Sequence, residues 1–233
     1  ATTYDKASLV MIPSGYKDDK LYSVKPTDGS GDFTFSRDGA GASPATRVNA
    51  SGYIEKGRTN ELVQSNTFDT TWYDSGVTET SGNSGYDGSN DAWEITRSGA
   101  FNYKAQDVTT SGVQTFSTYA KRSSFDFLLI RFQRTSTSYG GAYFDLASGV
   151  VGSTDGSGVI DSNIESVGGD WYRISITFNE SLLRVLYYPV PSDGGVGTGG
   201  SGSVFIQDAQ LEQGLISTSY IETTTAPVSA GLL

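Results

Sequence analysis

The chain has 233 residues and a formal net charge of −10, and it contains neither cysteine nor histidine. Without cysteine there are no disulfides and no thiolate chemistry, and without histidine there is no Ser-His or Cys-His catalysis and no imidazole metal site. The negative charge disfavours nucleic acids and anionic membranes, because both partners attract Lys and Arg. We therefore expect a protein that is not an enzyme, requires no cofactor, and binds neither nucleic acid nor membrane.

Residues 1–60 are predicted to form an extended N-terminal arm. Two short apolar segments, 7–13 and 32–36, are separated by Gly- and Asp-rich stretches such as 26–31. Segments this short cannot build a core of their own. The arm is therefore expected to lie against another surface.

Residues 61–222 are predicted to form an antiparallel β-sandwich or jelly roll. From Tyr172 to Phe178 the even-numbered residues are apolar, and the odd-numbered residues between them are polar. This alternation with a period of two is typical of a β-strand. Segment 125–133 is apolar on both faces, as expected for a central strand covered on each side. Gly, Ser and Asp clusters separate the segments, which favours an all-β sandwich over a parallel α/β sheet. The predicted strands are 91–97, 100–104, 114–121, 125–133, 142–146, 158–165, 171–178, 184–189 and 204–211.

Residues 223–233 are predicted to be a C-terminal tail. They are polar and β-prone, and no partner for them is evident in the sequence. Such a tail either pairs with a neighbouring chain or is loosely held.

Aromatic side chains in loops are the candidates for carbohydrate binding. Flat rings stack on sugar faces, but most aromatic residues of a β domain belong to the core or to cross-strand pairs. Tyr73, Tyr86 and Tyr139 lie in Gly- and Ser-rich loops, where a core role is less expected. A wider set with the same chemistry comprises Trp72, Trp93, Tyr103 and Trp171.

Acidic residues offer two further chemistries. Asp208 interrupts the otherwise apolar segment 204–211, and its carboxylate suits Ca²⁺, a hard cation that prefers oxygen ligands. The alternative is an outward-facing Asp on an alternating strand, which is the more common arrangement. Paired carboxylates could also serve a glycosidase, but nothing in the spacing singles out a pair among Glu94, Asp145, Glu165 and Glu180.

Motifs spread in order over nearly the whole chain add a resemblance to a known group of proteins. They are residues 5–17, 20–26, 33–37 (FTFSR), 45–49 (ATRVN), 52–55, 58–60 (RTN), 64–66 (QSN), 115–121, 171–173, 208–212 (DAQLE) and 218–221. Together they resemble bacteriophage virion proteins that carry a jelly-roll domain like a carbohydrate-binding module. Such modules occur in tail fibres, tailspikes, head fibres and capsid decoration proteins. The resemblance also implies a calcium site near Asp208, although the usual partner ligands cannot be matched here.

The resemblance implies a structural protein of the phage virion, either a capsid decoration protein or a short fibre protein. Residues 1–60 would anchor it to other virion proteins of the capsid or tail. A homotrimer is the preferred oligomer, because an arm with unpaired strand edges gains from neighbouring copies. Residues 1–20 contain no apolar run typical of a signal peptide, so synthesis in the host cytoplasm is expected. The alternative is a receptor-binding adhesin that recognises polysaccharide on host or environmental surfaces.

Overall fold

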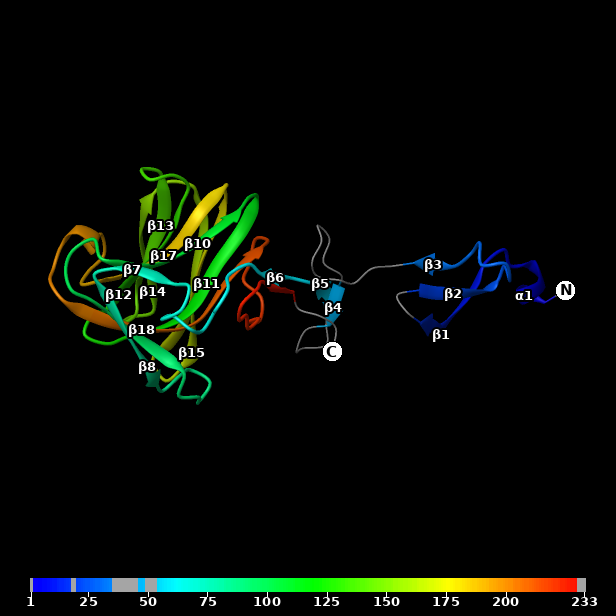
Figure 1. Ribbon diagram of the computed structural model, residues 1–233, viewed down its shortest axis with the longest axis horizontal. Coiled ribbons are helices and arrows are strands. Elements are labelled where there is room, and N and C mark those ends of the chain that lie inside the picture. Colours follow the sequence, from blue (N-terminus) through cyan, green and yellow to red (C-terminus); the bar gives the residue numbers. More distant parts are fainter. Residues whose placement is uncertain (1, 18–19, 35–45, 49–53, 230–233) are drawn as a thin grey trace. The chain divides into compact units, whose positions relative to one another are not determined.

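The computed structural model describes residues 2–17, 20–34, 46–48 and 54–229 (Figure 1). The chain divides into two compact units, with the boundary between Gly57 and Arg58, three residues before the predicted one. We call residues before Arg58 unit 1 and Arg58–Ser229 unit 2. Among the described residues, no helix is long and apolar enough to cross a membrane.

Unit 1 contains a small antiparallel sheet where the sequence predicted an arm. The sheet has the order β1 (Val10–Lys17), β2 (Lys20–Lys25), β3 (Phe33–Thr34). A one-turn helix, α1 (Thr3–Lys6), precedes it, and β4 (Thr46–Val48) pairs with β5 (Ile54–Lys56). Asp32 closes the turn between β2 and β3, because its carboxylate accepts a hydrogen bond from Ser23 N at 2.8 Å and pairs with Lys20 at 3.0 Å.

Two stretches of unit 1 bury no side chain. Over residues 4–11 and 20–33 no side chain is buried, and Leu9 and Phe33 are 51% and 59% exposed. Side chains this exposed contribute little to the stability of a small sheet. That residues 1–60 cannot form a core of their own stays a prediction.

Unit 2 is a sandwich of two six-stranded antiparallel sheets, which confirms the predicted all-β jelly-roll class (Figure 1). From β9 (Ala92–Arg97) to β12 (Phe127–Gln133), strands adjacent in sequence alternate between the two sheets. The β12 sheet has the order β14 (Val150–Gly156), β13 (Tyr139–Asp145), β12 (Phe127–Gln133), β17 (Leu182–Val190), β10 (Tyr103–Thr110), β7 (Tyr73–Ser75). The β11 sheet has the order β15 (Val159–Gly168), β16 (Trp171–Asn179), β11 (Val113–Arg122), β18 (Gly202–Gln213), β9 (Ala92–Arg97), β8 (Val77–Asn83).

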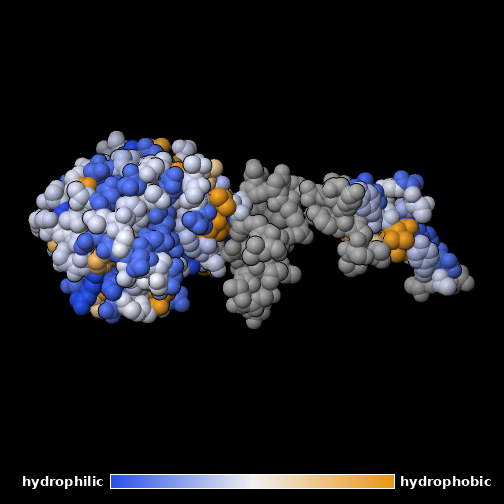
Figure 2. Space-filling model, turned by 60° about the horizontal axis from the view of Figure 1, so that its bottom comes forward, coloured by the Kyte–Doolittle hydropathy of each residue, from blue (hydrophilic) through white to orange (hydrophobic). Residues whose placement is uncertain are grey.

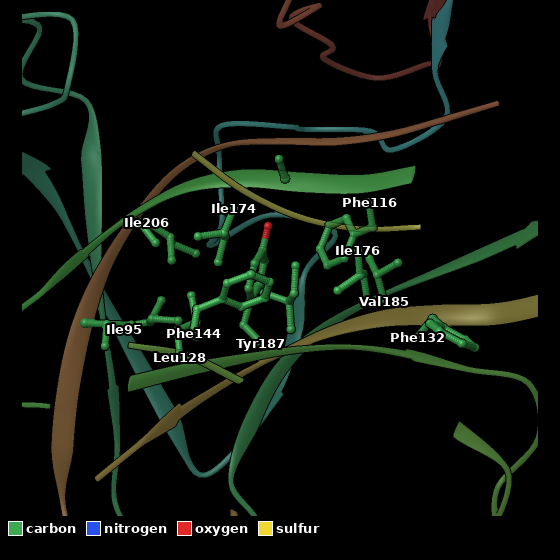
Figure 3. Packing of buried hydrophobic residues seen from close by; sticks show 14 of the residues in the cluster. Ile95, Phe116, Leu128, Phe132, Phe144, Ile174, Ile176, Val185, Tyr187 and Ile206 are labelled. Carbon is green, nitrogen blue, oxygen red and sulfur yellow. The ribbon is translucent and has the colours of Figure 1, made fainter. Parts of the chain in front are cut away.

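The core fills the space between the two sheets. Residues alternate along each strand, so one set of side chains from each sheet points into this layer and is fully buried. Tyr187 lies near its middle, with its ring 5.4 Å from that of Phe116 on the opposite sheet. The outer surface of unit 2 is mostly hydrophilic in the view of Figure 2, with small apolar patches. Figure 3 shows core side chains from both sheets: Ile95, Phe116, Leu128, Phe132, Phe144, Ile174, Ile176, Val185, Tyr187 and Ile206.

Three strands of the two six-stranded sheets were missed by the sequence prediction, and one was misplaced. The missed strands are β7, β8 and β14, which form or adjoin sheet edges and carry mainly polar residues. An edge strand with few buried positions has no strong alternation to detect. Segment 100–104 was predicted as a strand, but β10 begins only at Tyr103 and runs to Thr110.

The described part of the predicted tail is docked within unit 2. Thr223 Oγ1 donates to Leu62 O at 2.7 Å, and Gln64 N donates to Thr224 O at 2.6 Å. Further on, β19 (Val228–Ser229) pairs with β6 (Thr59–Asn60). Residues 223–229 thus pair within the same chain, and the prediction for 230–233 lies outside the described residues.

Replacing Gly140 with Ala should lower the free energy of unfolding by about 2 kcal/mol or more, because a side chain there overpacks the sheet. A Cβ at Gly140 would overlap the Ser157 carbonyl oxygen and come within 2.6 Å of Phe132 Cζ. Gly200→Ala is the matched control, since a Cβ at that position meets no heavy atom within 4 Å. Urea unfolding of both variants checks the prediction, and equal midpoints would contradict it.

Candidate functional site

Polar, cationic and aromatic side chains that can bind a ligand lie together on the outward face of the β12 sheet. Strand register places Gln133 opposite both Arg184 of β17 and Tyr139 of β13, and places Arg131 opposite Leu186. Because residues two apart share a face of a strand, Arg131 and Gln133 both point away from the core formed by their even-numbered neighbours. The face is therefore built from three adjacent strands, whose relative position the sandwich fixes.

A pocket of about 500 Å³ opens on this face. This volume is within the roughly 300–1,000 Å³ typical of small-ligand sites. The loop after β17 bounds the face at one end, where Val196 packs on it and accepts a backbone hydrogen bond from Phe101 at 2.9 Å. The lining combines aromatic, aliphatic, polar and cationic side chains: Phe101, Tyr103, Arg131, Gln133, Thr135, Ser136, Tyr139, Leu183, Arg184, Leu186 and Tyr188.

Arg131 forms a stack with two tyrosines of the lining. Its guanidinium carbon lies 4.1 Å from the ring centroid of Tyr139 and 4.5 Å from that of Tyr188. Nη1 of Arg131 donates to the Tyr188 hydroxyl at 3.1 Å, and Nη2 forms an ion pair with Asp155. Arg131 is only 9% exposed, so these contacts hold the two rings in place before any ligand arrives.

One edge of the Arg184 guanidinium group faces an acidic side chain, and the other edge has no partner among the described residues. Its Nε lies 3.1 Å from Asp107 Oδ1, which also accepts a hydrogen bond from the Tyr73 hydroxyl at 2.8 Å. The Nε–H is not aligned to complete a hydrogen bond with that oxygen. Within the part of the chain that the structure describes, the terminal amino groups of Arg184 donate no hydrogen bond.

Other polar groups of the pocket lack internal partners as well. Among the described residues, the Gln133 amide and the hydroxyls of Tyr103 and Tyr139 make no hydrogen bond. Phe101 and Leu183 add apolar surface at the rim, and Phe101 is 63% exposed. Free donors and acceptors next to exposed apolar surface are what a ligand with both kinds of surface requires.

The outward face of the β11 sheet is covered by the chain's own loops. Tyr86 stacks on Tyr119 with ring centroids 3.6 Å apart and planes within 7°. Farther along, Arg173 donates to the Thr218 carbonyl, and Gln210 Nε2 donates to Ser219 O at 3.4 Å. This face is therefore filled, whereas the pocket face of the β12 sheet is open.

A second, smaller pocket of about 210 Å³ surrounds Asp208. Strand β18 has a bulge here, where Asp208 adopts a φ of 58° and its N–H donates to Asn66 Oδ1 at 3.2 Å. The Tyr86 hydroxyl donates to Asp208 Oδ2 at 2.9 Å. The lining is rich in oxygen: Asn66, Tyr86, Asp87, Asp91, Asp208, Tyr220 and Glu222.

Burial raises the pKa of Asp208 to about 7. The nearby carboxylates of Asp91, Asp87 and Glu222 add to the rise, because like charges disfavour ionisation, while the hydrogen bond from Tyr86 opposes it. Its carboxylate and its neighbours have the oxygen chemistry that Ca²⁺ prefers. Within the described residues, however, no three carboxylates converge on one point, so these residues do not form a ready metal centre.

Comparison with known proteins shows similarity of architecture only. No family model and no curated protein matches the chain. Among solved structures, the CBM22-1 xylan-binding domain of Paenibacillus barcinonensis Xyn10C has 12% identity and a TM-score of 0.39, with 67% of this chain and 94% of that chain covered. The Clostridium thermocellum xylanase 10B CBM22-1–GH10 modules, solved with xylohexaose, have 12% identity and a TM-score of 0.38 over 70% of this chain. This chain spans 29% of that xylanase chain.

A phage structure is also similar. The tripod from the baseplate of bacteriophage Tuc2009 has 15% identity and a TM-score of 0.34, covering 76% of this chain and 64% of that chain. Identities and TM-scores this low limit the likeness to a β-sandwich architecture, and no ligand or partner follows from them.

The structure separates the predicted site residues into two places. Tyr139 lines the large pocket, and Tyr73 lies on the same sheet face beside Arg184, with the guanidinium carbon 5.5 Å from its ring. Tyr86 and Asp208 lie together at the smaller pocket instead.

The sequence prediction missed the two arginines and Tyr188. The available signal was in segments 125–133 and 184–189, whose outward positions carry Arg131, Arg184 and Tyr188. Segment 125–133 was interpreted as covered on both sides, but its second face carries the pocket.

Proposed function

We propose that unit 2 binds a polysaccharide chain in the pocket on the β12 sheet. The observation that carries this proposal is the set of free hydrogen-bonding groups next to exposed aromatic and aliphatic side chains on an uncovered sheet face. A sugar ring offers apolar C–H faces and a rim of hydroxyls, and therefore matches both kinds of surface. The stacked Arg131 keeps Tyr139 and Tyr188 ordered, which reduces the entropy lost on binding.

The test is a polysaccharide panel probed with the full chain and two variants. Phe101→Ala removes the most exposed ring of the pocket and should weaken binding about tenfold, because the flat apolar face on which a sugar ring would stack is lost. Leu215→Ala is the control, because Leu215 is similarly exposed but does not line the pocket. Failure of the folded wild-type chain to bind any polysaccharide would overturn the proposal.

Unit 1 supports a second proposal, that it attaches the protein to a phage particle. The exposed Leu9 and Tyr22, in stretches (4–11 and 20–33) that bury no side chain, favour a role in contact with another protein. On this proposal the chain is a decoration or short fibre protein, and it assembles as a homotrimer. Light scattering should then give three times the chain mass, and mass spectrometry should find the chain in purified particles. A monomer that is found only in the lysate would contradict it.

Calcium at the Asp208 pocket stays a prediction. The oxygen ligands are present, but they would have to move together to bind an ion. Calorimetric titration of Ca²⁺ into the wild type and Asp208→Asn decides the matter. Heat of binding in the wild type alone supports a site, and its absence from both excludes one.

A further inference from the structure

We propose that the polysaccharide bound on the β12 sheet carries carboxylate groups, as polymers of uronic acids do. This inference rests on the proposed function and specifies the class of ligand. Its starting point is the charge of the pocket lining, which contains two arginines and neither Asp nor Glu. The chain as a whole has 26 acidic and 16 basic residues, so a lining with arginines and no acidic residue departs from the rest of the protein.

Arg131 lies in the pocket lining, but the carboxylate of Asp155 balances its charge. Asp155 and the Tyr188 hydroxyl occupy its terminal amino groups, so it has little capacity to form a new bidentate pair. Its role is therefore to hold the two tyrosine rings rather than to bind the anion. Arg134 lies nearby but does not line the pocket, and Glu180 balances its charge.

Arg184 supplies the contact that distinguishes acidic from neutral sugars. Asp107 faces its Nε, while its terminal amino groups point to no partner among the described residues. The free edge of a guanidinium matches the two oxygens of a carboxylate, and such paired bonds are stronger than bonds to neutral hydroxyls. Asp107 is mostly exposed and does not line the pocket, so it does not fill the place of a ligand carboxylate.

The remaining polar groups do not discriminate between the two classes of sugar. Gln133 and the hydroxyls of Tyr103 and Tyr139 can bind sugar hydroxyls whether or not the ring carries an acid. Removing Arg184 should therefore abolish the preference for acidic sugars while leaving most of the affinity for neutral ones.

The experiment compares each of several uronic-acid polymers with its carboxyl-reduced counterpart, which keeps the backbone but loses the charge. The full wild-type chain should bind the acidic form about tenfold more tightly, as expected for one charge-assisted pair. Arg184→Gln should bring the ratio of the two affinities near one. Arg184→Lys should restore part of the preference for the acidic form, because lysine returns the positive charge but not the planar guanidinium group. Raising NaCl from about 50 to about 500 mM should weaken the acidic form selectively.

The matched control is Arg122→Gln. Arg122 is an exposed arginine paired with Asp126 at 3.3 Å on the other sheet, so the variant removes the same charge away from the pocket and should keep the preference. Equal binding of acidic and reduced polymers by the wild type would overturn this inference and leave the proposed function standing. Binding of neither form would overturn both, and unchanged circular dichroism of Arg184→Gln excludes misfolding as the cause of a lost preference.

Discussion

Asp208→Asn should stabilise the protein at pH 8 and have little effect near pH 4. In the folded state burial raises the pKa of Asp208 to about 7, above its ordinary value of 3.8, so the folded protein holds this proton more tightly than the unfolded chain. The stability that this carboxyl contributes is therefore complete at low pH and is lost as the pH rises through 7. A pKa shift of this size lowers the free energy of unfolding of the wild type by an amount on the order of 2–4 kcal/mol at pH 8.

Asparagine removes this cost without disturbing the local backbone. The φ of 58° at Asp208 is a left-handed conformation that Asn adopts as readily as Asp. The amide oxygen can still accept the hydrogen bond from Tyr86. The three acids that face Asp208 (Asp87, Asp91 and Glu222) no longer repel a neighbouring charge.

Urea unfolding in the presence of a chelator, at several pH values between about 4 and 8, measures the effect. The difference between variant and wild type should grow with pH and level off above the pKa of Asp208. Asp126→Asn, which removes an exposed charge on the surface, should show no such growth. A variant that is less stable than the wild type at pH 8 would refute the electrostatic explanation.

Arg131→Met should lower the free energy of unfolding by about 3 kcal/mol and also weaken polysaccharide binding. The change leaves the Asp155 carboxylate without its cationic partner in a largely buried position, and breaking such pairs is costly. It also removes the support between the rings of Tyr139 and Tyr188.

A double variant separates the charge from the packing. Arg131→Met with Asp155→Asn removes the unpaired charge and should recover at least half of the lost stability, while binding stays weak because the stack is gone. Urea unfolding and binding to the same polysaccharide measure the two effects. If the double variant is as unstable as the single one, the ion pair is not the cause of the loss.

Much of the sandwich could be predicted from the sequence. The alternation between Trp171 and Phe178 identifies β16, because a strand with one buried face repeats every two residues. Segment 125–133, which is apolar on both faces, locates β12. The pairing of 223–229 with the start of unit 2 was missed, because contacts between residues more than 150 positions apart leave no local pattern.

The candidate site was predicted only in part. Tyr139 was selected as a loop residue but is the first residue of β13, and the same reasoning also selected Tyr86, which stacks on Tyr119 and belongs to the smaller pocket. The arginines were missed because their role depends on strand register, which places Arg184 opposite Gln133. Loop composition alone carries no information on that register.

The central claim is that the outward face of the β12 sheet is the binding surface. The most direct test is nuclear magnetic resonance of the isotope-labelled full chain during titration with a polysaccharide fragment that binds. The account predicts that the largest amide shifts fall at Arg131, Gln133, Tyr139 and Arg184, on β12, β13 and β17. Shifts that instead centre on Tyr86 and Asp208, with those four amides unchanged, would contradict it.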